Sequence, residues 1–340
     1  MNGRISTSEM RTLIDTQVAW TARDVADRRT WTTLFSSAQQ AEIVDASKAV
    51  DTGGTVSNEA LREAFELASL EAEVATWVQT LRDRKGFVLV RDFPLHELTT
   101  RQTELAYVGL GLQMGDPVSQ NAAGDLLGHV RNEGVERTDP SVRLYQTRQR
   151  QDFHTDGADI VGLLCLEPSR SGGESRIASA ATVYNRILRE RPDLLEVLYA
   201  PMYWDRNGEE PAGEDPYFAL PVISEVAGSP RIFFIGWYIR DAQRHPGVPR
   251  LTPMQVEAIE LIEHIANDPD VYLEMDFRPG DIQWLANDRI LHSREAYDDD
   301  PERPRHLLRL WLAARNFAGV HDVLRGGIPP KDVARTPGRS

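Results

Sequence analysis

Cysteine is almost absent from this sequence of 340 residues, in which Cys165 stands alone. A single thiol excludes a disulfide within the chain, and it excludes zinc or iron–sulfur sites built from several cysteines. Long apolar runs are also absent. The first residues contain no segment that resembles a signal peptide, and no stretch approaches the length of a transmembrane span. We therefore expect a cytoplasmic protein.

Basic residues are outnumbered, since 38 Lys and Arg face 52 Asp and Glu, for a formal net charge of −14. Such a surface repels phosphate backbones and anionic lipid, so we expect neither a nucleic-acid nor a membrane partner. A small anionic ligand stays open, because a local arginine cluster can override the mean field. The sequence has no glycine-rich loop of the G-x-G-x-x-G or Walker type, so nothing favours dinucleotide or ATP chemistry.

The sequence does contain a series of short segments rich in branched and aromatic residues, which are typical of strands. Helices are expected over 57–85 and 100–112, and one later helix begins at Thr252, which can cap it. So few helices between strands favour a β-sandwich or barrel with flanking helices over a doubly wound parallel sheet. The predicted strands are 86–93, 126–132, 160–167, 174–179, 217–226, 231–239, 281–286 and 305–314.

Three residues could hold a metal ion. His154 and Asp156 are two positions apart, and in an extended segment such residues point to the same face, with alpha carbons about 6.6 Å apart. His292 could supply a third ligand, because two histidines and one carboxylate with open positions are the ligands of non-haem iron(II) oxygenases. Taken singly, each feature has a simpler explanation: a solvated loop pair for the first two residues, and a core histidine for the third.

Arg305 and Arg309 fall on one face of a predicted strand, together with Leu307 and Trp311. Two inward-facing arginines in so apolar a segment are costly unless they meet anions. Arginine is also the preferred bidentate partner of a carboxylate. A structural ion pair with one of the many acidic residues remains the alternative.

Taken together, these features resemble the taurine dioxygenase and clavaminate synthase-like superfamily of iron(II)/2-oxoglutarate-dependent oxygenases. The resemblance extends from about Gly86 to Trp311, and five markers occur in the family's order. That order is far more specific than any one marker. The markers are His154/Asp156, Gly172-Gly173-Glu174-Ser175, Gly280-Asp281, His292 and Arg305/Arg309.

The resemblance implies a double-stranded β-helix (jelly roll) with helical flanks, of the α+β class. It implies that His154, Asp156 and His292 bind Fe(II), and that Arg305 and Ser175 bind the co-substrate 2-oxoglutarate. With O2, such an enzyme hydroxylates, desaturates or cyclises a small substrate and releases succinate and CO2. Asp156 itself argues against halogenation, since halogenating relatives lack this carboxylate.

The substrate is expected to be a small organic molecule, an amino or carboxylic acid, because Arg309 could bind an anionic group. Asn132 and Trp284 are further candidates for contact with it, although aromatic residues in strands are more often plain core. The sequence departs from the family at Leu285-Ala286-Asn287, where Trp-Asp-Asn is common, and at Ser175, where Thr is common. These differences concern substrate identity rather than metal binding.

Three segments are expected along the chain: a helical N-terminal extension over 1–55, a jelly-roll oxygenase domain over 56–318, and a flexible tail over 319–340. Two other functions compete with the oxygenase. One is a non-catalytic jelly-roll protein that binds a small anion, and the other is a zinc hydrolase that uses the same three ligands. The sequence does not indicate an oligomeric state.

Overall fold

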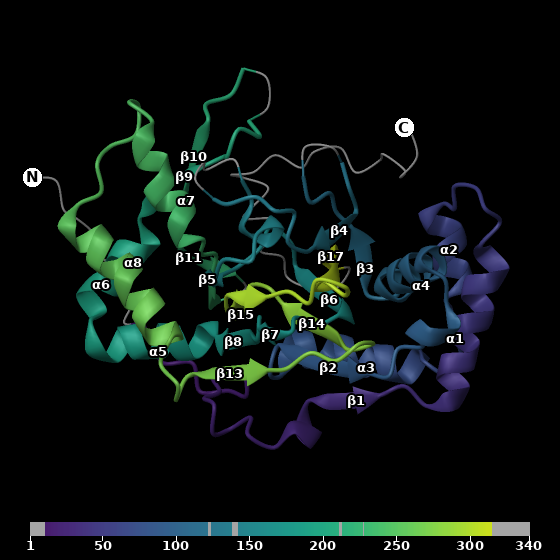
Figure 1. The fold of residues 1–340 in the computed structure, drawn as a ribbon. Helices are drawn as coiled ribbons and strands as arrows, with labels where there is room; N and C mark the ends of the chain where they lie inside the picture. Colours follow the sequence, from purple (N-terminus) through teal and green to yellow (C-terminus); the bar gives the residue numbers. More distant parts are fainter. Residues whose placement is uncertain (1–10, 122–123, 138–141, 211–212, 227, 315–340) are drawn as a thin grey trace, which may run out of the picture.

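The computed structural model describes residues 11–314, except for 122–123, 138–141, 211–212 and 227. Two β-sheets face each other, and helices cover the outer side of each sheet (Figure 1). Residues from both sheets meet in one apolar cluster between them, which includes Leu89, Val161, Ile177 and Ile290. The predicted class, mainly β with flanking helices around a jelly-roll core, is confirmed.

The larger sheet has the strand order β1-β2-β14-β6-β17-β3, and β4 pairs with β17 beside β3. Its pairs are antiparallel except for β1 with β2. The strands are β1 (Thr32–Leu34), β2 (Phe87–Arg91), β3 (Gly115–Pro117), β4 (Leu127–Val130), β6 (Ile160–Glu167), β14 (Ile282–Ala286) and β17 (His306–Ala314).

The smaller sheet has the order β13-β8-β15-β5 and is antiparallel throughout. Three strand pairs lie outside the two sheets: β9 with β10, β11 with β12, and β7 with β16. The strands of the smaller sheet are β5 (Gln151–His154), β8 (Ser175–Ser179), β13 (Tyr272–Met275) and β15 (Ile290–Arg294). The paired strands are β7 (Ser171–Gly172), β9 (Pro201–Asp205), β10 (Tyr217–Pro221), β11 (Ile223–Val226), β12 (Ser229–Ile232) and β16 (Tyr297–Asp298).

Helices form the two outer layers, with α1–α4 against the larger sheet and α5, α6 and α8 against the smaller one (Figure 1). Capping boxes begin three of them, at Ser36, Thr99 and Thr252. The α-helices are α1 (Ser37–Val50), α2 (Asn58–Ala64), α3 (Glu71–Asp83), α4 (Thr100–Leu112), α5 (Ala180–Glu190), α6 (Pro192–Tyr199), α7 (Gly236–Asp241) and α8 (Pro253–Ala266). Single 3-10 turns lie at Arg28–Thr30, Leu95–Glu97, Leu144–Gln146 and Ala242–Arg244.

Several predicted elements need correction. The segment 231–239 is not one strand, because β12 ends at Ile232 and helix α7 begins at Gly236. Most of its apolar residues are buried, and a short apolar run cannot distinguish a strand from a buried helix. Helices α5 and α6 were missed, and the helix expected over 57–85 is interrupted between α2 and α3. Within 1–55, only α1 is α-helical among the described residues, and the tail at 319–340 lies outside them.

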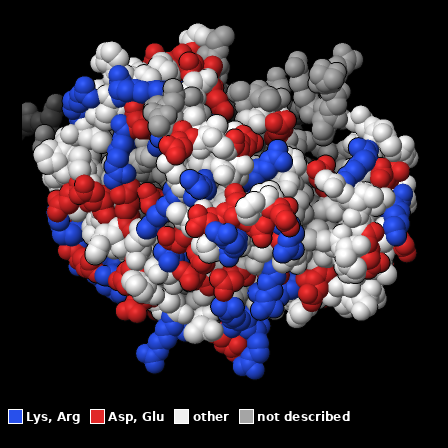
Figure 2. Space-filling model, viewed as in Figure 1, with Lys and Arg blue, Asp and Glu red and all other residues white. Residues whose placement is uncertain are grey.

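Charged residues of both signs are interspersed over the face shown in Figure 2. Many form ion pairs at the surface, such as Arg191 with Glu257 and Arg240 with Glu263. Within the described part of the chain, none of the helices combines the length and apolar character needed to cross a bilayer.

Candidate active site

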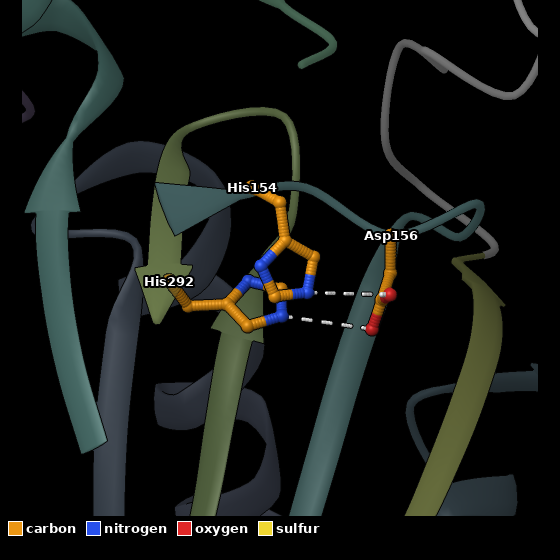
Figure 3. A group of neighbouring side chains, drawn as sticks. All are labelled: His154, Asp156 and His292. Carbon is orange, nitrogen blue, oxygen red and sulfur yellow. Dashed lines mark ion pairs between the residues drawn. The ribbon is translucent and has the colours of Figure 1, made fainter. Parts of the chain in front are cut away.

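His154, Asp156 and His292 converge between the two sheets (Figure 3). His154 is the last residue of β5, and the register of the smaller sheet places it directly opposite His292 on β15. Paired residues of neighbouring strands share a face, and the two imidazole centroids are 4.2 Å apart. Asp156 follows two residues after His154. All three side chains are buried, with 3%, 7% and 8% exposed for His154, Asp156 and His292.

The separations of the three groups suit a shared metal ion. His154 Nε2 lies 3.9 Å from Asp156 Oδ1, and His292 Nε2 lies 3.6 Å from Asp156 Oδ2. These distances are too long for good hydrogen bonds. Two atoms that each bind one ion at about 2.1 Å can be at most about 4.2 Å apart, so both distances are compatible with ligation. Two nitrogens and one oxygen are also a donor set that iron(II) accepts.

The imidazole of His154 is held in the form that a metal requires. Its Nδ1 lies 2.8 Å from the carbonyl oxygen of Asp152 and donates to it, while the amide of Gln151 lies 3.0 Å from Nε2. The hydrogen bond from Nδ1 places the lone pair on Nε2, where the Gln151 amide donates to it and must move away when a metal ion binds. Burial, followed by the neighbouring His292, lowers the pKa of His154 to about 3. At neutral pH this imidazole is therefore uncharged and able to ligate a cation.

The carboxylate of Asp156 is surrounded by donors and positive charge. The indole Nε1 of Trp311 donates to Oδ2 at 2.9 Å, and Arg309 Nη1 lies 3.7 Å from the same oxygen. Burial alone would raise the pKa of this carboxyl, but Arg309, followed by His292 and His154, outweighs that effect and holds it below its ordinary value. Asp156 is therefore ionised, as a metal ligand must be.

Asn287 fixes the backbone that carries Asp156. Its Oδ1 accepts from the Asp156 backbone N–H at 2.7 Å, and its Nδ2 donates to the carbonyls of Asp156 at 2.6 Å and Ala158 at 2.8 Å. Thr155 is tied in turn to Phe234 through its backbone and hydroxyl. These three hydrogen bonds make Asn287 a positioning residue for the Asp156 segment.

The three candidate ligands open onto a cavity of about 480 Å³, a volume that includes its open mouth. Arg305 and Ser175, the residues expected to bind 2-oxoglutarate, line the same cavity. The Gly172-Gly173 turn before Ser175 has φ of 71° and 76°, a conformation that favours glycine. A Cβ at Gly173 would come within 3.2 Å of the Arg305 guanidinium, so the glycine lets the turn pass close to this arginine.

Arg309 is fixed by contacts on several sides. Its Nε donates to Gln120 Oε1 at 2.7 Å, and Gln120 Nε2 returns a hydrogen bond to the Arg309 carbonyl at 2.8 Å. The rings of Tyr145 and Trp311 lie 4.7 and 4.6 Å from the guanidinium carbon. This arginine is therefore positioned in the cavity before any ligand arrives.

Two predicted substrate contacts do not reach the cavity. Trp284 is fully buried on the opposite face of the larger sheet, where it stacks on Tyr107 with ring centroids 5.5 Å apart. Side chains alternate between the two faces of a strand, so the neighbouring Gln283 points toward the cavity side, where its Nε2 donates to Ser175 Oγ at 3.3 Å. Asn132 follows β4 and lies 3.5 Å from Asp299, and it is not among the lining residues. The interpretation of Trp284 as plain core was the correct one.

Sequence reasoning missed several residues of the site. Gln120 and Tyr145 come from segments with no motif, so only the tertiary structure brings them in. Gln151 precedes His154 by three residues on β5 and was not singled out. Trp311 could have been found, because it shares the inward face of its strand with Arg309. Arg294 also carried a signal, since it lies two residues after His292 and strand alternation points both side chains into the cavity.

Known proteins are similar to this chain over most of its length. An FR-33289 synthase of Streptomyces rubellomurinus is 32% identical over 306 residues, which span 87% of this chain and 89% of the relative. Among solved structures, an asparagine oxygenase bound to Fe(II), 2S,3S-3-hydroxyasparagine and succinate superimposes with a TM-score of 0.65 at 16% identity, covering 83% of this chain and 93% of its own.

A second solved structure, the non-haem iron oxygenase OrfP with iron and alpha-ketoglutaric acid, gives a TM-score of 0.64 at 13% identity, with coverage of 84% and 98%. At such identities the two structures show a shared fold. The family model for taurine catabolism dioxygenase TauD, TfdA family matches residues 53–311, well over half of the chain. The predicted reaction class, an iron(II)- and 2-oxoglutarate-dependent dioxygenase, is confirmed, and the chain belongs to the taurine catabolism dioxygenase TauD, TfdA family.

Proposed function

We propose that His154, Asp156 and His292 bind Fe(II), and that Arg305 and Ser175 bind the distal carboxylate of 2-oxoglutarate. The observation that carries this proposal is the convergence of three ligand atoms, all within 4.8 Å of one another, in the cavity that also holds Arg305 and Ser175. Iron and 2-oxoglutarate together supply the oxidising chemistry with O2, by which a C–H bond of the substrate is oxidised as succinate and CO2 are released.

The substrate, we infer, is a small amino or carboxylic acid that presents an anionic group to Arg309. Gln120, Tyr145 and Trp311 hold this guanidinium in place, so little conformational entropy is lost when an anion binds. The asparagine oxygenase of similar fold binds a hydroxylated amino acid. The oxidation would be a hydroxylation, a desaturation or a ring closure.

The apolar residues of the cavity have a separate role. Val161, Leu163 and Leu307 line it beside the charged groups. They exclude water and lower the local dielectric constant, which strengthens each charge–charge contact within the cavity. The family match over 53–311 also supports our proposal that residues 56–318 form the oxygenase domain, with 1–55 as an N-terminal extension.

Asp156→Ala removes the single carboxylate from the proposed ligand set. We expect substrate oxidation to be lost, because two imidazoles alone hold Fe(II) weakly and without the charge that Asp156 supplies. Succinate release and O2 uptake, measured with Fe(II) and 2-oxoglutarate, report the loss. Asp83→Ala, at an exposed carboxylate of α3, serves as the control. Turnover of Asp156→Ala at the unmutated rate would refute the ligand assignment.

Trp311→Phe keeps an aromatic ring at this position but removes the indole N–H that donates to Asp156. Partners of a metal ligand commonly contribute 10- to 100-fold to metal affinity, so we expect Fe(II) affinity to fall by roughly that factor. A competition titration against a coloured chelator, without O2, gives the dissociation constant. Trp237→Phe is the matched control, because its ring lies 5.1 Å from that of His154 and no hydrogen bond to Asp156 is present. Equal affinities for Trp311→Phe and the unmutated protein would contradict this role.

The substrate class can be tested with compounds in pairs that differ in one carboxylate, such as an amino acid and its amide. Without O2, the Fe(II)–2-oxoglutarate complex has a weak visible absorption band that shifts when substrate enters. We expect the free acids to shift the band at lower concentration than their amides, since Arg309 binds a carboxylate. A stronger response to the amides would exclude a substrate that binds through its carboxylate.

A further inference from the structure

Arg294 lies in the cavity beside Arg305, and the reaction chemistry described so far assigns it no role. Both guanidiniums lie close to the ring of Tyr297, at 4.9 and 5.0 Å from its centroid. Both arginines are buried, with 6% and 3% of their surfaces exposed. The two guanidiniums repel each other. Among the described residues, neither of them forms an ion pair with a carboxylate.

The strand register directs Arg294 toward the proposed carboxylate site. In the pairing of β15 with β8, Arg294 is directly opposite Ser175, so their side chains lie on the same face of the smaller sheet. Arg305 immediately precedes β17 of the larger sheet. All three residues line one cavity. Two guanidiniums and a hydroxyl therefore surround the same end of that cavity.

The hydrogen bonds of the two arginines are incomplete. Arg294 donates from Nη2 to the carbonyl oxygen of Gln149, but its Nε and Nη1 have no partner. Nη1 of Arg305 has no partner either. A buried guanidinium with unused donors is costly, and a second one beside it adds repulsion. An anion bound between them would offset both penalties, and a carboxylate has the planar geometry that arginine donors match.

We propose that Arg294 is a second carboxylate-binding arginine, which joins Arg305 and Ser175 around the distal carboxylate of 2-oxoglutarate and makes the site selective for dicarboxylic 2-oxo acids. This inference rests on the proposed function of the cavity. One competing explanation is purely structural: Arg294 could serve to hold the segment at Gln149 through its single hydrogen bond. The two roles differ in whether the effect of Arg294 depends on the ligand's distal carboxylate.

Arg294→Gln separates the two roles when two ligands are compared. 2-Oxopentanoate has the chain length of 2-oxoglutarate and lacks only the distal carboxylate. We expect the dissociation constant of 2-oxoglutarate to rise by about 10- to 100-fold, the usual effect of losing hydrogen bonds to a charged group. The affinity for 2-oxopentanoate should stay unchanged. Both constants come from equilibrium titration of the Fe(II)-loaded protein without O2, followed by the visible band of the bound 2-oxo acid.

Two further variants complete the experiment. Arg176→Gln is the matched control: Arg176 is next to Ser175 on β8, but its side chain pairs with Glu274 and Glu295 on the other face, so both affinities should be retained. Arg294→Lys keeps the charge without the planar pair of donors, and it should show a smaller loss that is again confined to 2-oxoglutarate.

Three outcomes have distinct meanings. A weakening of both ligands by the same factor in Arg294→Gln and Arg294→Lys would assign Arg294 a structural role and overturn the proposal. Unchanged binding of 2-oxoglutarate in Arg294→Gln would overturn it as well, while leaving the proposed function intact. Failure of the unmutated Fe(II)-loaded protein to bind 2-oxoglutarate would instead refute the proposed function itself.

Discussion

The antiparallel pairing of β5 with β15 and of β15 with β8 is the constraint on which the site depends. The ladder of β15 with β5 sets His154 opposite His292, and the ladder on the other side of β15, with β8, sets Arg294 opposite Ser175. A slip by one residue would turn each of these side chains to the opposite face of the sheet. The proposed metal ligands and the proposed carboxylate site are therefore not independent features, because β15 contributes a residue to each and its two ladders position both. Asn287 holds the third proposed ligand in place through its hydrogen bonds to the backbone of Asp156.

The second organising feature is a reversal of charge between the surface and the cavity. The chain as a whole has a net charge of −14, yet the described lining of the cavity holds three arginines, Arg294, Arg305 and Arg309, and a single carboxylate, Asp156. Buried charges of one sign are unfavourable until counter-ions arrive. A dianionic co-substrate and an anionic substrate would provide them. The acidic exterior repels large polyanions, whereas the narrow positive interior attracts small ones.

The reaction class could be predicted because it depends on short motifs whose order along the chain is itself informative. His154, Asp156 and His292, the ligands that this order implied, lie close enough together to hold one metal ion. Strand alternation also placed Arg305 and Arg309 on one inward face, but it could not tell which sheet face Trp284 occupies, because both faces of β14 are buried. Helices α5 and α6 were missed although their apolar residues recur at helical spacing, as Val183, Tyr184 and Ile187 do in α5. Gln120 and Tyr145 reach the site only through tertiary contacts, which no local pattern records.

The central claim is that one metal ion binds His154, Asp156 and His292 beside the arginine-lined end of the cavity. A crystal structure of the protein grown without O2 in the presence of Fe(II) and 2-oxoglutarate, with the iron located by anomalous scattering, tests it most directly. We expect an iron peak at about 2.0–2.2 Å from one atom of each of the three side chains, with the distal carboxylate of 2-oxoglutarate against Arg305. An iron peak away from these residues, or a 2-oxoglutarate that points its distal carboxylate elsewhere, would contradict it.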